Sequence, residues 1–163
     1  MPSRQAAPPI RYMDLVNSVT ADLPPLPVAE LGPPTLALPA APLARSRVII
    51  VTSAGVRERD SPPYQPVNDM SFRTLGHSVP TASLLPSHPT PVRRPGERDI
   101  NVVYPVDRLA ELVASGAVGA PAAWNLSFLG TIKRLPALVT QLAPAMVESA
   151  RAAGAELALL VPL

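Results

Sequence analysis

Eight residues carry polar side chains or backbone amides suited to holding a small charged ligand, and they lie at the ends of the predicted elements. A tight turn at Ser53 and Gly55, directly after a buried strand, can present backbone amides to a carboxylate. A strand-to-loop turn without a ligand explains these two residues equally well. The candidate substrate-binding residues are Ser53, Gly55, His88, Asp99, Asn101, Asp107, Arg108 and Ser127.

Both histidines, His77 and His88, lie in a long proline-rich segment. An imidazole there can bind a carboxylate or carry a proton, and His88 is the better candidate. A solvated loop histidine is the plain alternative for each. Two histidines without local context do not make a Ser-His-Asp triad, and one histidine without cysteine does not assemble a tight metal site. We therefore expect no catalytic residue and no metal site within this chain.

A second group of candidates flanks a predicted strand in the middle of the chain. Asp99, Asn101, Asp107 and Arg108 can line a substrate crevice there. Alternatively, Asp107 and Arg108 are ordinary first-turn helix residues, with Asp107 favoured by the helix dipole. Candidates Ser127 and Phe128 are expected on opposite faces of a later strand, with Phe128 in the core. Trp124 is also expected in the core.

Composition bounds the class of protein. The chain has 163 residues, the size of one domain, and 47% hydrophobic residues, enough for a core. Its net charge of +2 comes from scattered basic residues that form no stripe, so no nucleic-acid partner is expected. The absence of cysteine excludes disulfides and thiolate zinc sites. The glycine-rich phosphate motifs are absent, and a flavin or nucleotide site would rest on fold analogy alone, so no cofactor is expected.

Nothing in the sequence predicts export or membrane insertion. The residues from Met1 to Ile10 lack the apolar core of a signal peptide. The longest apolar runs, such as Leu157 to Leu163, are too short to cross a bilayer. We therefore expect a cytoplasmic protein.

Proline divides the chain into an arm and a domain. Of the 23 prolines, 18 precede Ile100, and dense proline prevents long helices and central strands. Residues 1–45 are interpreted as a proline-rich N-terminal arm, extended over 21–45 after a short helix over 11–19. A disordered tail is the alternative, but apolar anchors in the arm favour docking. Residues 46–163 are interpreted as one α/β domain.

The domain alternates between strands and helices. Arg47 to Thr52 is β-branched and apolar, as in a strand buried on both faces of a parallel sheet. A long irregular stretch over 56–98 follows, of the kind that is either functional or disordered. Asp99 to Tyr104 is predicted as a short strand. A helix then starts at Pro105 and ends at Gly116, where a left-handed cap is expected.

The last third of the chain repeats this alternation. A strand is predicted over 122–129, and a helix over 135–153 that Pro144 kinks or divides and Gly154 closes. The helix is apolar enough to pack on the sheet. A final strand is predicted over 156–163. This order predicts an α/β fold, a flavodoxin-like three-layer open parallel sheet that is incomplete at its C-terminus.

Several segments resemble the glycine/sarcosine/betaine/D-proline reductase selenoprotein B family. The run Arg98 to Leu109 differs only conservatively from the family's "RDINVVFPIDRL", and Asn125 to Gly130 is similar to its "HFSFMG". Weaker similarity covers Val51 to Val56, Ser61 to Tyr64 and the final strand. The resemblance extends over roughly residues 47–163.

The resemblance implies a reductase component that cleaves C–N bonds of an amino acid or amine. The family uses a cysteine or selenocysteine redox centre, because a thiolate or selenolate is the reactive form at neutral pH. It further implies partner subunits or a thioredoxin-like dithiol donor. In the family the redox motif directly follows the strand that matches Leu157 to Leu163. One hypothesis is that a UGA codon for selenocysteine has been read as a stop; a shortened chain or a degenerate paralogue are the alternatives.

One departure from the family lies in the loop. The family often carries an "HHHYD"-like stretch where this chain has Pro86 to Thr90, with one histidine and no acidic follower. A non-catalytic substrate-binding or assembly module is therefore the competing hypothesis. Homo-oligomers are also expected, because the final apolar strand lacks a segment to cover it.

Overall fold

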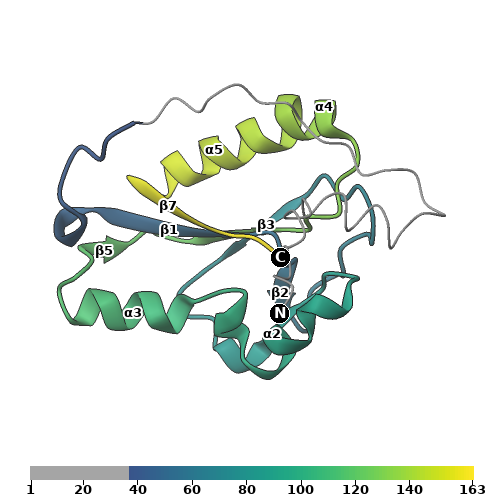
Figure 1. The fold of residues 1–163 in the computed structure, drawn as a ribbon, viewed down its shortest axis with the longest axis horizontal. Coiled ribbons are helices and arrows are strands. Elements are labelled where there is room, and N and C mark those ends of the chain that lie inside the picture. The colour runs from purple at the N-terminus through teal and green to yellow at the C-terminus, as the bar shows by residue number, and fades with distance from the viewer. Residues whose placement is uncertain (1–36) are drawn as a thin grey trace, which may run out of the picture. The chain divides into compact units, whose positions relative to one another are not determined.

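The computed structural model describes residues 37–163, and β1 (Arg47–Thr52) lies in the middle of its main sheet (Figure 1). Ile49 and Ile50 of β1 have no exposed surface at all. A strand of consecutive β-branched residues is stable in this position because both of its faces are covered. The prediction for 47–52 is confirmed residue for residue.

The main sheet has five strands, four of them parallel. β1 pairs in parallel with β5 (Ala120–Pro121) and β6 (Asn125–Phe128), which follow one another along the same edge of β1. On its other edge β1 pairs in parallel with β7 (Leu157–Val161). β3 (Phe72–Leu75) pairs antiparallel with β6 and closes that side of the sheet.

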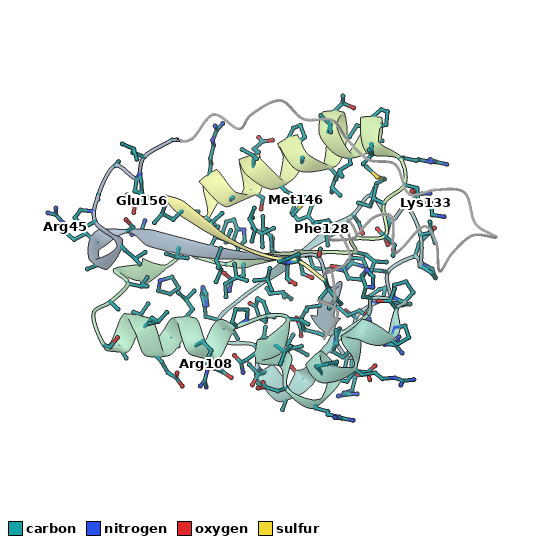
Figure 2. The ribbon with its side chains drawn as sticks, in the orientation of Figure 1. Arg45, Arg108, Phe128, Lys133, Met146 and Glu156 are labelled. Atoms are coloured by element: carbon teal, nitrogen blue, oxygen red, sulfur yellow. The ribbon has the colours of Figure 1, made fainter. Side chains whose placement is uncertain are left out.

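Helices cover the two faces of this sheet. α3 (Val106–Ala114) directly precedes β5 in the chain and covers one face of the sheet. Its Leu109 packs in one core with Val48 and Ile50. On the other face, Met146 of α5 (Ala143–Ala152) packs in a second core with Ile49 and Leu126. Figures 1 and 2 show α5 above the sheet, with Met146 beneath it, and α3 below. The α/β prediction is confirmed, and the order β6-β1-β7 is compatible with a flavodoxin-like sheet.

The predicted helix over 135–153 is present and is divided as expected. It begins as α4 (Leu135–Ala137), passes through a π-helical turn at Leu138–Leu142, and continues as α5. Pro144 has no amide to donate and collides with a regular preceding turn, so it sits in the first turn of α5, after the wider π-turn. Gly154, with φ +72°, follows the helix.

The helix at the centre of the chain also follows its prediction. Pro105 caps α3, the amide of Leu109 bonds to the Pro105 carbonyl, and Gly116 adopts φ +75° after the last turn.

The strand predicted over 99–104 is wrong. Ile100–Val102 forms a 3-10 turn, in which the amide of Val103 donates to the carbonyl of Ile100. The Asp99 carboxylate accepts a hydrogen bond from the Asn101 amide and starts this turn. Ile100, Val103 and Tyr104 are buried, so their apolar character reflects packing in the core rather than membership of the sheet. The prediction over 122–129 is met by the shorter β6.

The stretch over 56–98 contains more structure than its sequence predicted. β2 (Val56–Glu58) and β4 (Leu84–Pro86) form a separate antiparallel pair, and β3 joins the main sheet. Short 3-10 turns at Leu43–Arg45, Thr81–Ser83 and Pro91–Arg93 and the short helix α2 (Arg94–Arg98) complete the described part. The helix expected over 11–19 and most of the arm lie outside the described residues.

Candidate functional site

The carboxyl end of β1 is the point where three strands are tied together. The Ser53 amide donates to the Val161 carbonyl at 3.1 Å, and the Ser53 hydroxyl accepts from the Leu163 amide at 2.9 Å. The carbonyl of Ser53 accepts from the Gly130 amide at 2.9 Å. The ends of β1, β6 and β7 therefore meet at Ser53, at the edge of a parallel sheet where α/β proteins place ligands.

Hydrogen bonds to other residues of the protein hold the turn after Ser53. Gly55 has φ +63°, and its amide donates to the Phe128 carbonyl at 2.8 Å. The amide of Ala54 donates to the Thr52 hydroxyl at 3.2 Å. The amides around the turn thus have protein acceptors, as the simple-turn alternative requires. Presentation of amides to a carboxylate stays a prediction.

His88 lies against the same turn. The amides of Ser87 and His88 both donate to the Ala54 carbonyl, at 3.2 and 3.1 Å. The His88 side chain is buried, and its Nδ1 lies 2.9 Å from the Thr90 hydroxyl. Two residues that are 35 positions apart in the sequence, Ser53 and His88, are therefore brought to one place.

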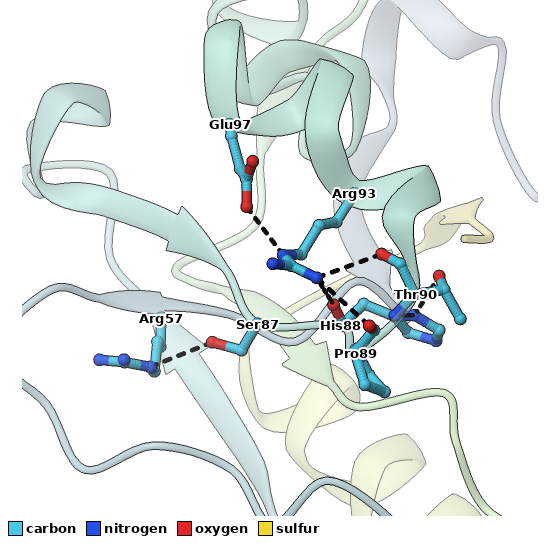
Figure 3. A network of polar contacts seen from close by, with 7 residues as sticks. All are labelled: Arg57, Ser87, His88, Pro89, Thr90, Arg93 and Glu97. Carbon is cyan, nitrogen blue, oxygen red and sulfur yellow. Dashed lines mark hydrogen bonds and ion pairs between the residues drawn. The ribbon is translucent and has the colours of Figure 1, made fainter.

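Two arginines hold the loop that carries His88 (Figure 3). Arg57 donates through Nε to the Ser87 hydroxyl at 3.1 Å. Arg93 pairs with the Glu97 carboxylate at 2.7 Å and donates to three carbonyls of the loop, those of His88, Pro89 and Thr90. A guanidinium that bonds several carbonyls constrains the path of the backbone on either side of His88.

The surroundings of His88 favour a neutral imidazole. Burial lowers the pKa of His88 below its usual value, and the positive charge of Arg93 lowers it further. A neutral imidazole can donate one hydrogen bond and accept another. It does not provide a fixed positive charge for a carboxylate.

Tyr64 and Ser127 lie beneath this edge. The Tyr64 hydroxyl donates to the Ser127 carbonyl at 2.9 Å, and the Arg73 guanidinium lies 4.5 Å from the centre of the Tyr64 ring. Burial raises the pKa of Tyr64 to about 12, so the phenol stays protonated at neutral pH. The Ser127 hydroxyl is fully buried and has no hydrogen-bond partner among residues 37–163. Tyr64 was not among the predicted site residues; the only sequence signal was its place in Ser61 to Tyr64.

Three other predicted site residues line a polar pocket of about 300 Å³. The Asn101 side chain joins the other two, donating to the Asp99 carboxylate at 3.1 Å and to the Asp107 carboxylate at 2.8 Å. Hydrogen bonds from the backbone and side chain of Asn101 lower the pKa of Asp99. Arg59 and Arg98 also line the pocket, so both signs of charge are present.

The eight predicted residues thus separate into groups. Ser53, Gly55 and His88 meet at the end of β1, with Ser127 buried in the neighbouring strand. Asp99, Asn101 and Asp107 share the polar pocket. Arg108 belongs to neither: it pairs with Glu111 at 2.8 Å, and its side chain is 60% exposed (Figure 2).

A second groove, of about 440 Å³, runs beside α3. His77, Asp107 and Leu109 are among the residues that line it. Within residues 37–163 no three His, Asp or Glu side chains gather as metal ligands. No helix in this described range is long and apolar enough to cross a bilayer.

Comparison with known proteins gives one partial relationship. The chain is 29% identical over 83 residues to D-proline reductase subunit gamma of Acetoanaerobium sticklandii. The matched region is 51% of this chain and 34% of that relative. No family model and no solved structure matches the chain. The similarity links the chain loosely to this group of reductases, and it does not single out the selenoprotein B type.

Proposed function

We propose that this chain is a component of a selenoprotein B-type reductase that cleaves the C–N bond of glycine, sarcosine, betaine or D-proline. The observation that carries the proposal is the similarity over 83 residues to a D-proline reductase subunit. The selenoprotein B-like runs at Arg98 to Leu109 and Asn125 to Gly130 support the same group.

The chemistry requires a residue that this chain does not contain. Reductive cleavage replaces a C–N bond with one C–H and one N–H bond, and it consumes two electrons and two protons. A dithiol, or a selenol and a thiol, supplies both as it is oxidised to a disulfide or selenenyl sulfide. The 163 residues include no cysteine, and the proposal places the redox centre after the strand that ends near Leu163, as the resemblance implies, with partner subunits or a thioredoxin-like protein reducing it again.

The geometry at Ser53 supports this arrangement. The Leu163 amide bonds to the Ser53 hydroxyl, and the His88 loop bonds to the adjacent Ala54 carbonyl. The proposal therefore has the redox residue beside the edge to which the Leu163 amide and the backbone of the His88 loop are bonded. The proposal gives the neutral imidazole of His88 the role of exchanging a proton with substrate.

The test is a longer polypeptide. The codons after Leu163 are appended, with an in-frame UGA decoded as cysteine, and the protein is incubated with a dithiol and each of the four substrates. We expect release of ammonia or amine, or ring-opened product from D-proline, and we expect none from the 163-residue chain. Replacing the added cysteine by serine should abolish turnover, and Ser53→Ala should reduce it.

Two results would contradict the proposal. One is an ordinary stop codon after Leu163 with no downstream frame resembling the family. The other is a longer polypeptide that folds, as judged by a cooperative urea transition, but releases no product with any of the four substrates.

A non-catalytic binding module is the second candidate, and the polar pocket favours it. Arg59 and Arg98 are suited to a carboxylate, and Asp107 to an ammonium group, as an amino acid zwitterion requires. Titration calorimetry with glycine and D-proline tests this. Arg59→Ala should weaken binding, whereas Arg45→Ala, in the turn that precedes β1, should not. Absence of binding by the parent chain would exclude this candidate.

A further inference from the structure

β7 is an edge strand whose outer side carries no partner within residues 37–163. It pairs with β1 over its whole length, from Val48 opposite Leu157 to Thr52 opposite Val161. In Figure 1, β7 lies below α5 and above α3. Among residues 37–163, the amides and carbonyls on its outer side therefore have no strand partner.

The sequence of β7 contains none of the features that normally protect an edge. Leu157 to Val161 reads Leu-Ala-Leu-Leu-Val, without charge, proline or glycine. Leu160 is 70% exposed and Leu159 is 45% exposed. Edge strands without lysine, proline or a bulge template pairing with other chains.

The opposite edge of the same sheet is protected. β3 is four residues long and includes Arg73, whose guanidinium stacks on the Tyr64 ring. Thr74 of β3 is exposed and polar. The lack of protection is therefore specific to β7 and not a general property of the fold.

The register with β1 shows which way the side chains of β7 point. Residues that pair across a sheet share a face, so Leu159 lies on the face of Ile50 and α3, and Leu160 on the face of Val51 and α5. Exposed leucines thus extend the apolar cores of both faces outward past the edge.

We propose that β7 pairs antiparallel with β7 of a second copy of this chain, about a twofold axis at Leu159. Such a pair is self-complementary. Leu159 lies opposite its own counterpart, Ala158 lies opposite Leu160, and Leu157 lies opposite Val161. Every cross-strand neighbour is apolar, and no like charges meet. The two sheets become one continuous sheet with both faces still covered by helices.

The first measurement is the mass of the chain in solution. Sedimentation velocity should give twice the 17.1 kDa of a single chain. Leu160→Lys should give a single chain, because two lysines then face the junction. This leucine is 70% exposed, so the substitution leaves the core intact. Leu112→Lys is the matched control: Leu112 on α3 is 47% exposed, and this variant should stay dimeric.

The second measurement uses the absence of cysteine, since each introduced thiol is the only one in the chain. Leu159→Cys should form a disulfide-linked dimer on mild oxidation, because residues directly opposite lie about 4.5–5.5 Å apart at Cα. Leu157→Cys should not link to itself, because its counterpart lies about 14 Å away. A mixture of Leu157→Cys and Val161→Cys should cross-link.

These results separate the proposed pairing from other outcomes. A parent chain that sediments as a monomer, or as a species larger than a dimer, would overturn it. So would a dimer that Leu160→Lys leaves intact, or cross-linking of Leu157→Cys in preference to Leu159→Cys. None of these measurements depends on reductase activity, so failure here leaves the proposed function untouched.

Discussion

The Asn125 side chain accepts a hydrogen bond from β1 at a point where the sheet has no backbone acceptor. Val48 of β1 lies opposite Pro121, and Val51 of β1 lies opposite Leu126. Three steps along β1 are therefore matched by five steps along the β5–β6 segment, which has two extra residues. The Ile50 amide therefore donates to the Asn125 side-chain oxygen at 2.8 Å. The Asn125 amide group in turn donates to the Tyr104 hydroxyl at 2.8 Å. All three residues are buried.

Asn125→Ala should lower the free energy of unfolding by on the order of 3 kcal/mol, because two buried groups lose their partner and each unpaired group costs about 1–3 kcal/mol. Urea denaturation followed by circular dichroism measures the change. Tyr104→Phe, which removes only the hydroxyl, should cost less. Equal costs for the two variants would show that the bond to Ile50 contributes nothing.

His88 should make folding sensitive to mild acid. Its pKa is lowered in the folded chain, so below pH 6.5 the unfolded chain binds the proton first. The stabilising contribution of neutral His88 is therefore complete above pH 6.5 and is lost as the pH falls through the lowered pKa of the folded chain. We expect His88→Gln to flatten this dependence of the urea midpoint. His77→Gln, at an exposed histidine, should retain it, and an unchanged slope in His88→Gln would contradict the assignment.

At the scale of elements, two glycines with positive φ have different reasons for being glycine. Gly116 closes α3 with open space around it, since a Cβ there meets nothing within 4 Å. Gly55 has a similar φ, but a Cβ there would lie 2.6 Å from a methyl group of Leu129, which is itself fully buried. Gly116 is required by backbone conformation alone, and Gly55 by conformation and close packing together.

The two positions make a matched pair. Gly116→Ala should cost roughly 1–2 kcal/mol of stability, the cost of a left-handed conformation for an L-residue. Gly55→Ala should cost about 1–3 kcal/mol more, because an overpacked core adds to it. Thermal or urea denaturation of both variants measures the difference. Equal losses would mean that Leu129 moves aside freely.

At the scale of the molecule, the proposed pairing of β7 makes thermal stability depend on protein concentration. If β7 pairs with a second copy, only the folded chain associates, and dissociation is coupled to unfolding. The melting temperature of the parent chain should then rise with protein concentration, and that of Leu160→Lys should stay constant. Calorimetric scans over a range of concentrations measure this, and a parent melting temperature independent of concentration would count against the pairing.

Elements whose signals are local were predictable from the sequence. β1 is a run of β-branched residues, α3 lies between Pro105 and Gly116, and the helix after Leu135 is divided by Pro144 and closed by Gly154. In each case, backbone sterics at one or two residues impose the boundary. The same local reasoning identified Ser53 and Gly55 at the end of β1.

Other features depend on contacts between distant residues. Asp99 to Tyr104 has the composition of a strand, yet the Asp99 cap and the burial of Tyr104 make it a turn. β3 joins the sheet only because β6 offers an edge, and His88 reaches Ser53 only through the carbonyl of Ala54. The sequence alone determined the α/β alternation, because helix and strand periodicities are patterns among residues that are close together in sequence. The tertiary structure decided which candidates share a site, because hydrogen bonds between residues far apart in sequence leave no local pattern.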